Sequence, residues 1–137
     1  MTTLKKSLAM MTLATLFTSS MAFAKDVTVQ AEGTKFVDMI VNVDPGDTVD
    51  WTNMDIHNVD FMFQPEGAKD FKSVIGQDVS RTFTKEGIYI YQCDPHIGLG
   101  MGGAVIVGKP TNLDALKAAH LHGGLGHVAH LAMKSLK

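Results

Sequence analysis

The chain of 137 residues is 45% hydrophobic, which is enough apolar material for one compact domain and does not suggest disorder. Its formal net charge of −2 excludes a broadly cationic nucleic-acid binder. Its single cysteine has no intramolecular partner, so no disulfide within the chain can stabilise the fold.

The N-terminus has the pattern of a secretory signal peptide. Lys5 and Lys6 precede an apolar run over residues 8–17, and Ala22-Phe23-Ala24 has the small-x-small form of a cleavage site. We therefore expect residues 1–24 to be removed and the mature chain to begin near Lys25. The run is shorter than the roughly 20 residues that span a bilayer. An uncleaved membrane anchor is the alternative.

Short apolar segments separated by turn residues follow, without intervening helices. Asp44-Pro45-Gly46-Asp47 is a strong turn signal, and Lys85-Glu86-Gly87 is another. The pattern predicts an all-β fold, an antiparallel sandwich or barrel, in one domain over residues 25–109. The expected strands are 27–30, 36–43, 48–52, 57–63, 79–83, 88–92 and 103–107. In the second of these, alternation places Val37, Met39, Val41 and Val43 on the buried face.

Residues 110–137 have helical character. A first helix is expected after a cap at Thr111 or Asn112, Gly123-Gly124 breaks it, and a second helix follows. The apolar face of the second helix should pack on the sandwich; it comprises Leu125, Val128, Ala129, Ala132, Met133 and Leu136. The histidines of this tail are His120, His122, His127 and His130. A polar helix surface is the favoured reading for them, and a second metal site is the alternative.

A candidate metal site lies directly after the predicted strand 88–92. Cys93, His96 and Met101 share one short loop, and His57 is the remaining histidine of the strand-rich region. Two imidazoles, a thiolate and a weak axial thioether form the ligand pattern of blue-copper electron-transfer sites. An exported lone thiol also needs protection from oxidation. We therefore expect these four residues to bind one copper ion.

Other interpretations of the same residues remain open at this stage. His57 alone could be a structural histidine at a strand end, and Met101 or Cys93 alone could be core packing. Structural zinc prefers four strong ligands, whereas this region offers three and a thioether. A Cys93–His96 nucleophile pair lacks an evident orienting group.

Pro95 bears on the redox potential. It has no backbone N–H and cannot donate a hydrogen bond to the Cys93 sulfur. Fewer donors to a thiolate favour a higher potential.

The segment from Cys93 to Val107 resembles the copper loop and last strand of plastocyanins and pseudoazurins, with the spacing Cys-x2-His-x4-Met. The resemblance extends back through Pro45-Gly-Asp-Thr-Val, His57-Asn58, Gly67-Ala68 and Phe71-Lys72-Ser73. The pair of C-terminal helices is a pseudoazurin feature. The resemblance implies a cupredoxin Greek-key β-sandwich with copper ligands His57, Cys93, His96 and Met101.

The same resemblance implies a role. Its members carry single electrons in the bacterial periplasm, with copper nitrite reductase or a cytochrome as partner. Asn58 would tie the ligand loops together beside Asp94 and Pro95, and Pro95, Ile97 and Leu99 would form an apolar docking patch around a partly exposed His96.

Several positions depart from the family pattern. Asp55-Ile56 and Gln92 stand where a ring of lysines usually surrounds the patch, and Asp94 replaces the usual Ser or Thr. The segment between Val27 and Phe36 is shorter than usual. The weaker basic ring bears on which redox partner the protein binds, because opposite charges steer encounter. Asp94 bears on the hydrogen bond of Asn58 and on the reduction potential.

We therefore expect an exported monomeric electron carrier that is not an enzyme and is not inserted in the membrane after cleavage. The runner-up is a periplasmic protein that binds or delivers copper, and an enzyme using Cys93 as its nucleophile is a third reading.

Overall fold

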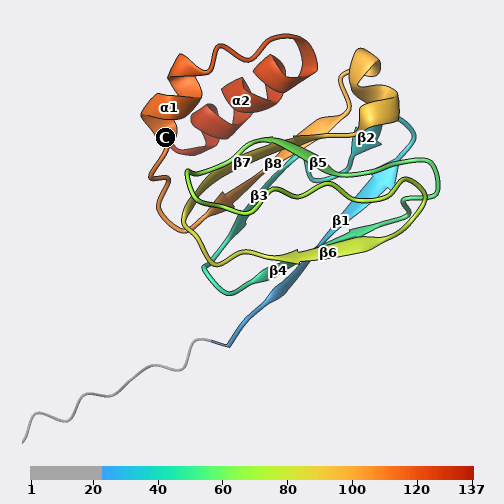
Figure 1. Cartoon of the computed structure of the whole chain (residues 1–137), viewed down its shortest axis with the longest axis horizontal. Coiled ribbons are helices and arrows are strands. Elements are labelled where there is room, and N and C mark those ends of the chain that lie inside the picture. The colour runs from blue at the N-terminus through green and yellow to red at the C-terminus, as the bar shows by residue number, and fades with distance from the viewer. Residues whose placement is uncertain (1–22) are drawn as a thin grey trace, which may run out of the picture.

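Two four-stranded β-sheets face each other in the computed structural model, which describes residues 23–137 (Figure 1). One sheet has the order β2-β1-β4-β6 and the other β3-β8-β7-β5. The strands are β1 Asp26–Glu32, β2 Lys35–Phe36, β3 Ile40–Val43, β4 Thr48–Thr52, β5 Asp60–Phe63, β6 Val79–Thr82, β7 Gly87–Gln92 and β8 Gly102–Val107. This confirms the predicted all-β sandwich. The predicted signal peptide lies almost entirely outside the described residues.

The sheets are mixed, which corrects the expectation of a purely antiparallel fold. β1 runs parallel to β4, and β3 runs parallel to β8, while the other strand pairs are antiparallel. Both parallel pairs join strands that are distant in sequence, so the chain has crossed between sheets before each pairing. Alternation and turn signals fix the faces of a strand but not its neighbour or its direction.

The predicted strand 36–43 is wrong as a single element. Phe36 belongs to β2 in one sheet and Ile40 begins β3 in the other, with a bend between them. Val37 is consequently half exposed rather than buried. The segment carries the chain across the edge of the sandwich, so its first half belongs to one sheet and its second half to the other.

The space between the sheets is filled by a cluster of aromatic side chains. Trp51 of β4 packs edge-on against Phe61 of β5 and Tyr91 of β7, at ring-centroid distances of 5.9 and 5.3 Å. Trp51, Tyr91 and Cys93 are fully buried in the same cluster. The core between the sheets therefore reaches directly to the thiol at the end of β7.

Two helices form a third layer on the outer face of the β7–β8 sheet (Figure 1). They are α1 Leu113–Ala118 and α2 Gly123–Ser135, and Leu116, Val128 and Ala132 are buried against this sheet. β7 and β8 are thus covered on both faces, which explains their nearly continuous apolar sequences. Gly123 begins α2 rather than lying in the connection, so the helix starts earlier than predicted.

The opposite end of the sandwich from the candidate site contains a carboxylate that holds the segment leading into β1. Asp47 accepts backbone N–H bonds from Lys25 and Asp44, both at 2.8 Å. The Asp44 bond, followed by the Lys25 bond, holds the pKa of Asp47 below its ordinary value of 3.8, against the opposing effect of burial. Asp47 therefore ties β1 to the turn before β4.

Asp47→Asn should lower the thermal midpoint at neutral pH, because an uncharged amide accepts these bonds more weakly. A lowered pKa means that the ionised carboxylate stabilises the fold above its ordinary pKa and loses that effect as the pH falls through the folded value. The difference between the two proteins should therefore shrink below pH 3.8, measured by circular dichroism melts. Glu66→Gln, which changes an exposed carboxylate elsewhere, is the control. A constant difference at all pH values would contradict this account.

Candidate metal centre

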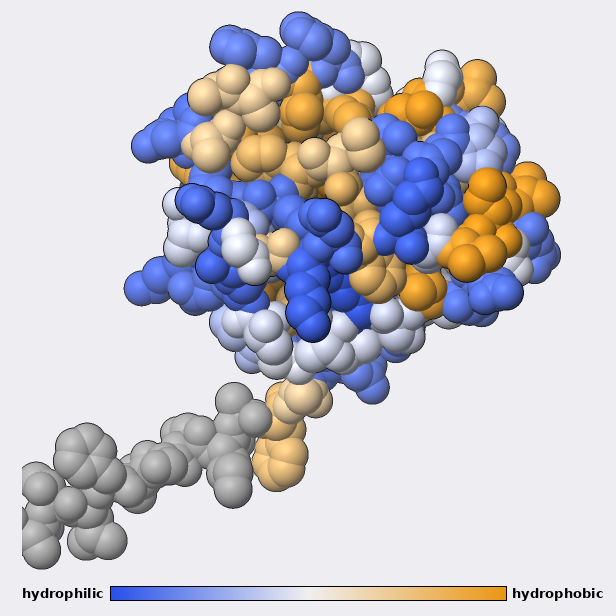
Figure 2. All heavy atoms as spheres, viewed as in Figure 1, coloured by the Kyte–Doolittle hydropathy of each residue, from blue (hydrophilic) through white to orange (hydrophobic). Residues whose placement is uncertain are grey.

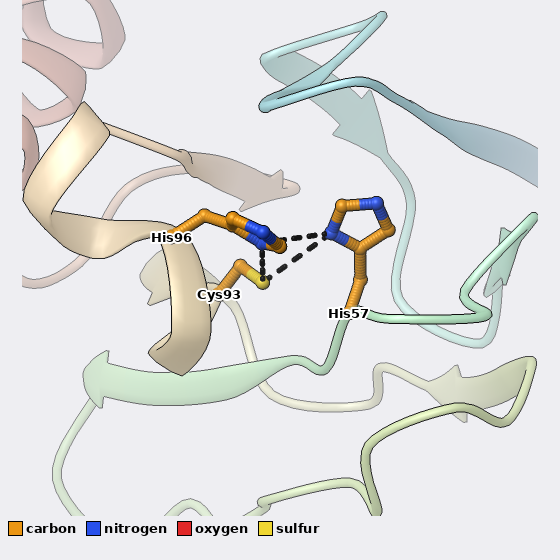
Figure 3. A group of neighbouring side chains, drawn as sticks. All are labelled: His57, Cys93 and His96. Carbon is orange, nitrogen blue, oxygen red and sulfur yellow. Dashed lines mark hydrogen bonds between the residues drawn. The ribbon is translucent and has the colours of Figure 1, made fainter.

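Three side chains from two separate parts of the chain converge at one end of the sandwich (Figure 3). The two imidazole Nδ1 atoms of His57 and His96 lie 3.2 Å apart. The Cys93 sulfur lies 3.6 Å from the His57 Nδ1 and 3.4 Å from the His96 Nδ1. Three donor atoms therefore form a nearly equilateral triangle.

The local backbone places these atoms. Cys93 follows the end of β7, and the 3-10 helix η1 Asp94–Leu99 then turns the chain so that His96 lies over the sulfur. Its turn is closed by the His96 N–H, which donates to the Cys93 carbonyl at 3.1 Å. His57 arrives from the connection between β4 and β5, where its N–H donates to the Met54 carbonyl at 3.0 Å.

Met101 is tied to the same loop. The Cys93 N–H donates to the Met101 carbonyl at 3.0 Å, and the Met101 N–H donates to the His96 carbonyl at 3.2 Å. Its side chain is buried in the same core cluster as Cys93. The backbone of Met101, the last of the predicted ligands, is therefore hydrogen-bonded to the backbone of both Cys93 and His96.

The triangle has the size of a metal site. The centre of a triangle with these sides lies about 2 Å from each corner, which is close to the bond lengths that imidazole nitrogen and thiolate sulfur make to a first-row metal ion. Nitrogen and sulfur donors in a trigonal array suit copper and do not complete the four strong ligands of structural zinc. The donor set thus fits a copper ion.

Burial acts in opposite directions on two of the ligands, because it favours the neutral form of His57 and disfavours the thiolate form of Cys93. It raises the pKa of the Cys93 thiol, although backbone N–H groups of Asn58 and His96 counteract this effect. Burial, followed by the proximity of His96, lowers the pKa of His57, while Asp55 opposes the change. His57 is therefore readily available as a neutral ligand, and the thiolate is favoured once a metal ion is bound.

Asn58 connects the two loops that carry the ligands. It is fully buried; its Oδ1 accepts the Asp94 N–H at 2.8 Å, and its Nδ2 donates to the Asp94 carboxylate at 2.9 Å. Because Asn58 follows His57 and Asp94 follows Cys93, this double hydrogen bond fixes the distance between the two ligands.

Lys72 extends this connection to a third segment. Its ammonium lies 2.7 Å from the Asp94 carboxylate and 2.9 Å from that of Asp60, and Gln92 donates to Asp94 at 2.8 Å. Burial raises the pKa of Asp94, but the bonds from Lys72, Gln92 and Asn58 outweigh it and lower the pKa to about 2. The aspartate that replaces the usual Ser or Thr therefore serves as the centre of an ionic network.

Sequence reasoning did not identify Lys72 or Gln92 as parts of the site. Lys72 lies in a connection with few apolar residues, and it forms an isolated bridge with Asp60 of β5. The pairing that brings Lys72 to Asp94 is long-range and leaves no local signal.

The tail histidines do not join the site. Within residues 23–137, His57, Cys93 and His96 form the one cluster of at least three His, Cys, Asp or Glu residues with metal-binding spacing. The four tail histidines are exposed: His120, His122, His127 and His130.

Comparison with known proteins agrees with the donor set. Residues 23–108 match the model of the copper binding proteins of the plastocyanin/azurin family. The chain belongs to this family. It is 41% identical over 90 residues to a pseudoazurin of Paracoccus pantotrophus, covering 63% of this chain and 62% of that protein. The matched stretch thus spans less than two thirds of this relative.

Solved cupredoxins have a similar fold. The pseudoazurin of Sinorhizobium meliloti is 35% identical, with a TM-score of 0.66 over 81% of this chain and 92% of that one. The pseudoazurin of Hyphomicrobium denitrificans is 30% identical, with a TM-score of 0.73 over 80% and 97%. The family match, together with the donor triangle of His57, Cys93 and His96, indicates one copper ion as the cofactor.

The helical layer touches the copper loop through two glycines. The Cα atoms of Gly100, at the end of η1, and Gly124, in the first turn of α2, are so close that a Cβ on Gly124 would lie 2.7 Å from the Gly100 Cα. Backbone thus meets backbone at this point, and the tail supports the loop that carries His96 and Met101.

Asn58→Ala should lower the free energy of unfolding by about 2 kcal/mol, because it leaves the partly buried N–H and carboxylate of Asp94 without the Asn58 amide that pairs with both. The measurement is urea denaturation of the copper-loaded and metal-free proteins. Asn42→Ala, at an exposed position of β3, is the matched control and should be nearly neutral. Equal effects of the two substitutions would refute the connecting role of Asn58.

Gly124→Ala should destabilise the protein and shift its visible spectrum, although alanine alone favours a helix by about 1 kcal/mol over glycine. The added methyl group must displace the backbone of Gly100 and with it the ligand loop. Gly98→Ala, on the same loop, is the control because its Cβ would meet nothing within 4 Å. An unchanged spectrum in Gly124→Ala would show that the helix does not support the loop.

Proposed function

We propose that this protein is an exported blue-copper electron carrier, in which His57, Cys93, His96 and Met101 bind one copper ion. The observation that carries the proposal is the triangle of two imidazoles and one thiol, with His57 and Cys93 buried and His96 partly exposed, already assembled by the protein itself. Copper in such a site supplies a one-electron couple between Cu(II) and Cu(I).

The protein contributes a ligand set that needs little rearrangement. Cys93 extends from a strand buried on both faces, and Asn58 fixes its loop to that of His57. A trigonal set of two nitrogens and one sulfur suits both oxidation states tolerably, so rigid ligands keep the cost of electron exchange low. The protein makes no covalent change to a substrate.

The two histidines have different access to solvent. His57 is buried with 4% of its surface exposed, whereas His96 is partly exposed on η1. Pro95 and Leu99 are exposed beside it, and Ile97 is partly buried. We propose that electrons enter and leave through His96, with these three residues as the docking patch.

The wider assignment follows from the sequence. We propose removal of residues 1–24 on export to the periplasm, a copper domain over residues 25–109 and an integral helical extension over residues 110–137. The protein would act as a monomer that docks transiently with redox proteins, such as copper nitrite reductase or a cytochrome.

The mature protein reconstituted with Cu(II) should show an intense charge-transfer band and narrow copper hyperfine splitting. Cys93→Ser should abolish the band because the thiolate is lost, whereas Met101→Leu should keep it and raise the potential, because a donor to Cu(II) is lost. Absorption, electron paramagnetic resonance and voltammetry provide the measurements. A persistent band in Cys93→Ser would refute the assignment. A weak band with wide splitting, or ready copper transfer to an apo acceptor, would favour copper delivery instead.

A further inference from the structure

The end of the sandwich that holds the copper ligands is acidic. Its carboxylates are Glu32, Asp38, Asp55, Asp60, Asp78 and Asp94, and its lysines are Lys35 and Lys72. We infer that the redox partner of this protein presents a basic face around its own redox centre. The inference rests on the proposed electron-carrier function and concerns the partner that this surface fits.

Two of the acidic residues flank the His57 loop. Asp55 is exposed two residues before His57 and is close enough to influence its pKa. Asp78 is also exposed and accepts the Met54 N–H at 3.0 Å, just upstream of the same loop. Neither residue has a basic partner among the ion pairs of the described residues.

Asp38 lies on the other side of this end. It is exposed next to Met39, whose carbonyl accepts the Ala104 N–H at 2.7 Å near the start of β8. The bend between β2 and β3 thus presents Asp38 close to the ligand loop that ends at Met101.

The lysines of this end are already neutralised. Lys35 pairs with Glu32 at 3.5 Å, and Lys72 is shared between Asp60 and Asp94. The Lys72 network therefore carries a net negative charge. Since Lys85 precedes the start of β7 and Lys109 follows the end of β8, these basic residues lie at the opposite end of the molecule.

The bound ion does not reverse the sign. A Cu(II)–thiolate pair adds one net positive charge and a Cu(I)–thiolate pair adds none, whereas Asp38, Asp55 and Asp78 each contribute one negative charge without a lysine partner. Opposite charges steer encounter and raise association rates, so this end favours a basic partner in both redox states.

Apolar side chains at the same end supply a contact surface. Leu99 is 71% exposed on η1, and Ile56, Val74 and Ile75 are more than half exposed. The last three lie on adjacent loops, because the Gly76 N–H donates to the His57 carbonyl at 3.1 Å. Figure 2 shows hydrophobic side chains gathered at the end of the molecule that holds η1 in Figure 1. An apolar centre with an acidic margin fits short-lived docking.

The test uses a cytochrome c whose haem edge is ringed by lysines, and the same cytochrome with its lysines succinylated. In stopped-flow mixing, the reduced copper-loaded protein gives one electron to the ferric haem. The reaction is run at a pH above the ordinary titration range of histidine. At low salt, the native cytochrome should react roughly tenfold faster than the succinylated one. Its rate constant should fall as the ionic strength rises. The double variant Asp38→Asn/Asp55→Asn should lower that rate about threefold.

Asp26→Asn/Asp44→Asn, which removes two exposed carboxylates at the opposite end of the sandwich, is the charge-matched control and should leave the rate unchanged. A faster reaction with the succinylated cytochrome, or equal effects of the variant and its control, would overturn the inference while leaving electron transfer intact. A protein that has the blue band but exchanges electrons with neither cytochrome would instead contradict the proposed function.

Discussion

Three atoms with lone pairs lie within 3.6 Å of one another in the protein, and the rest of the structure serves to keep them there. Such donors gain little from meeting in the absence of a cation, so the fold must supply the energy that brings them together. The double hydrogen bond between Asn58 and Asp94 is the direct constraint, because it joins the two loops one residue away from their ligands. Lys72 then ties that aspartate to β5, so the site is braced from a third segment.

The three-layer arrangement explains why this bracing works. β7 ends at the residue before Cys93, and β8 begins at the residue after Met101, so both ends of the ligand loop are fixed by central strands of one sheet. The opposite sheet covers one face of these strands and the helices cover the other. The helical tail also meets the loop directly at Gly100 and Gly124. The tail is thus part of the support of the site.

Much of this was accessible from the sequence, for identifiable reasons. Strands such as β4 and β7 carry local alternation or apolar runs bounded by turns, and the ligand loop has a diagnostic spacing of Cys93, His96 and Met101. The errors lie where a local pattern spans a long-range event. Residues 36–43 have the alternation of a single strand, although the chain changes sheets near Val37. Alternation shows which face a residue lies on but not which sheet it belongs to. The parallel pairings and the Lys72–Asp94 contact were missed for the same reason, since each depends on partners distant in the sequence.

The double coverage of β7 and β8 also determines where the protein can open. Local opening needs few buried contacts and exposed backbone hydrogen bonds. Those conditions hold at β2, which has two residues, and at the edge strand β6, and they fail at β7 and β8. Amide protons of the strands on either side of the ligand loop should therefore exchange with solvent last, and those of the edge strands first. Opening at β2 or β6 therefore leaves the loop between β7 and β8, which carries Cys93, His96 and Met101, in place.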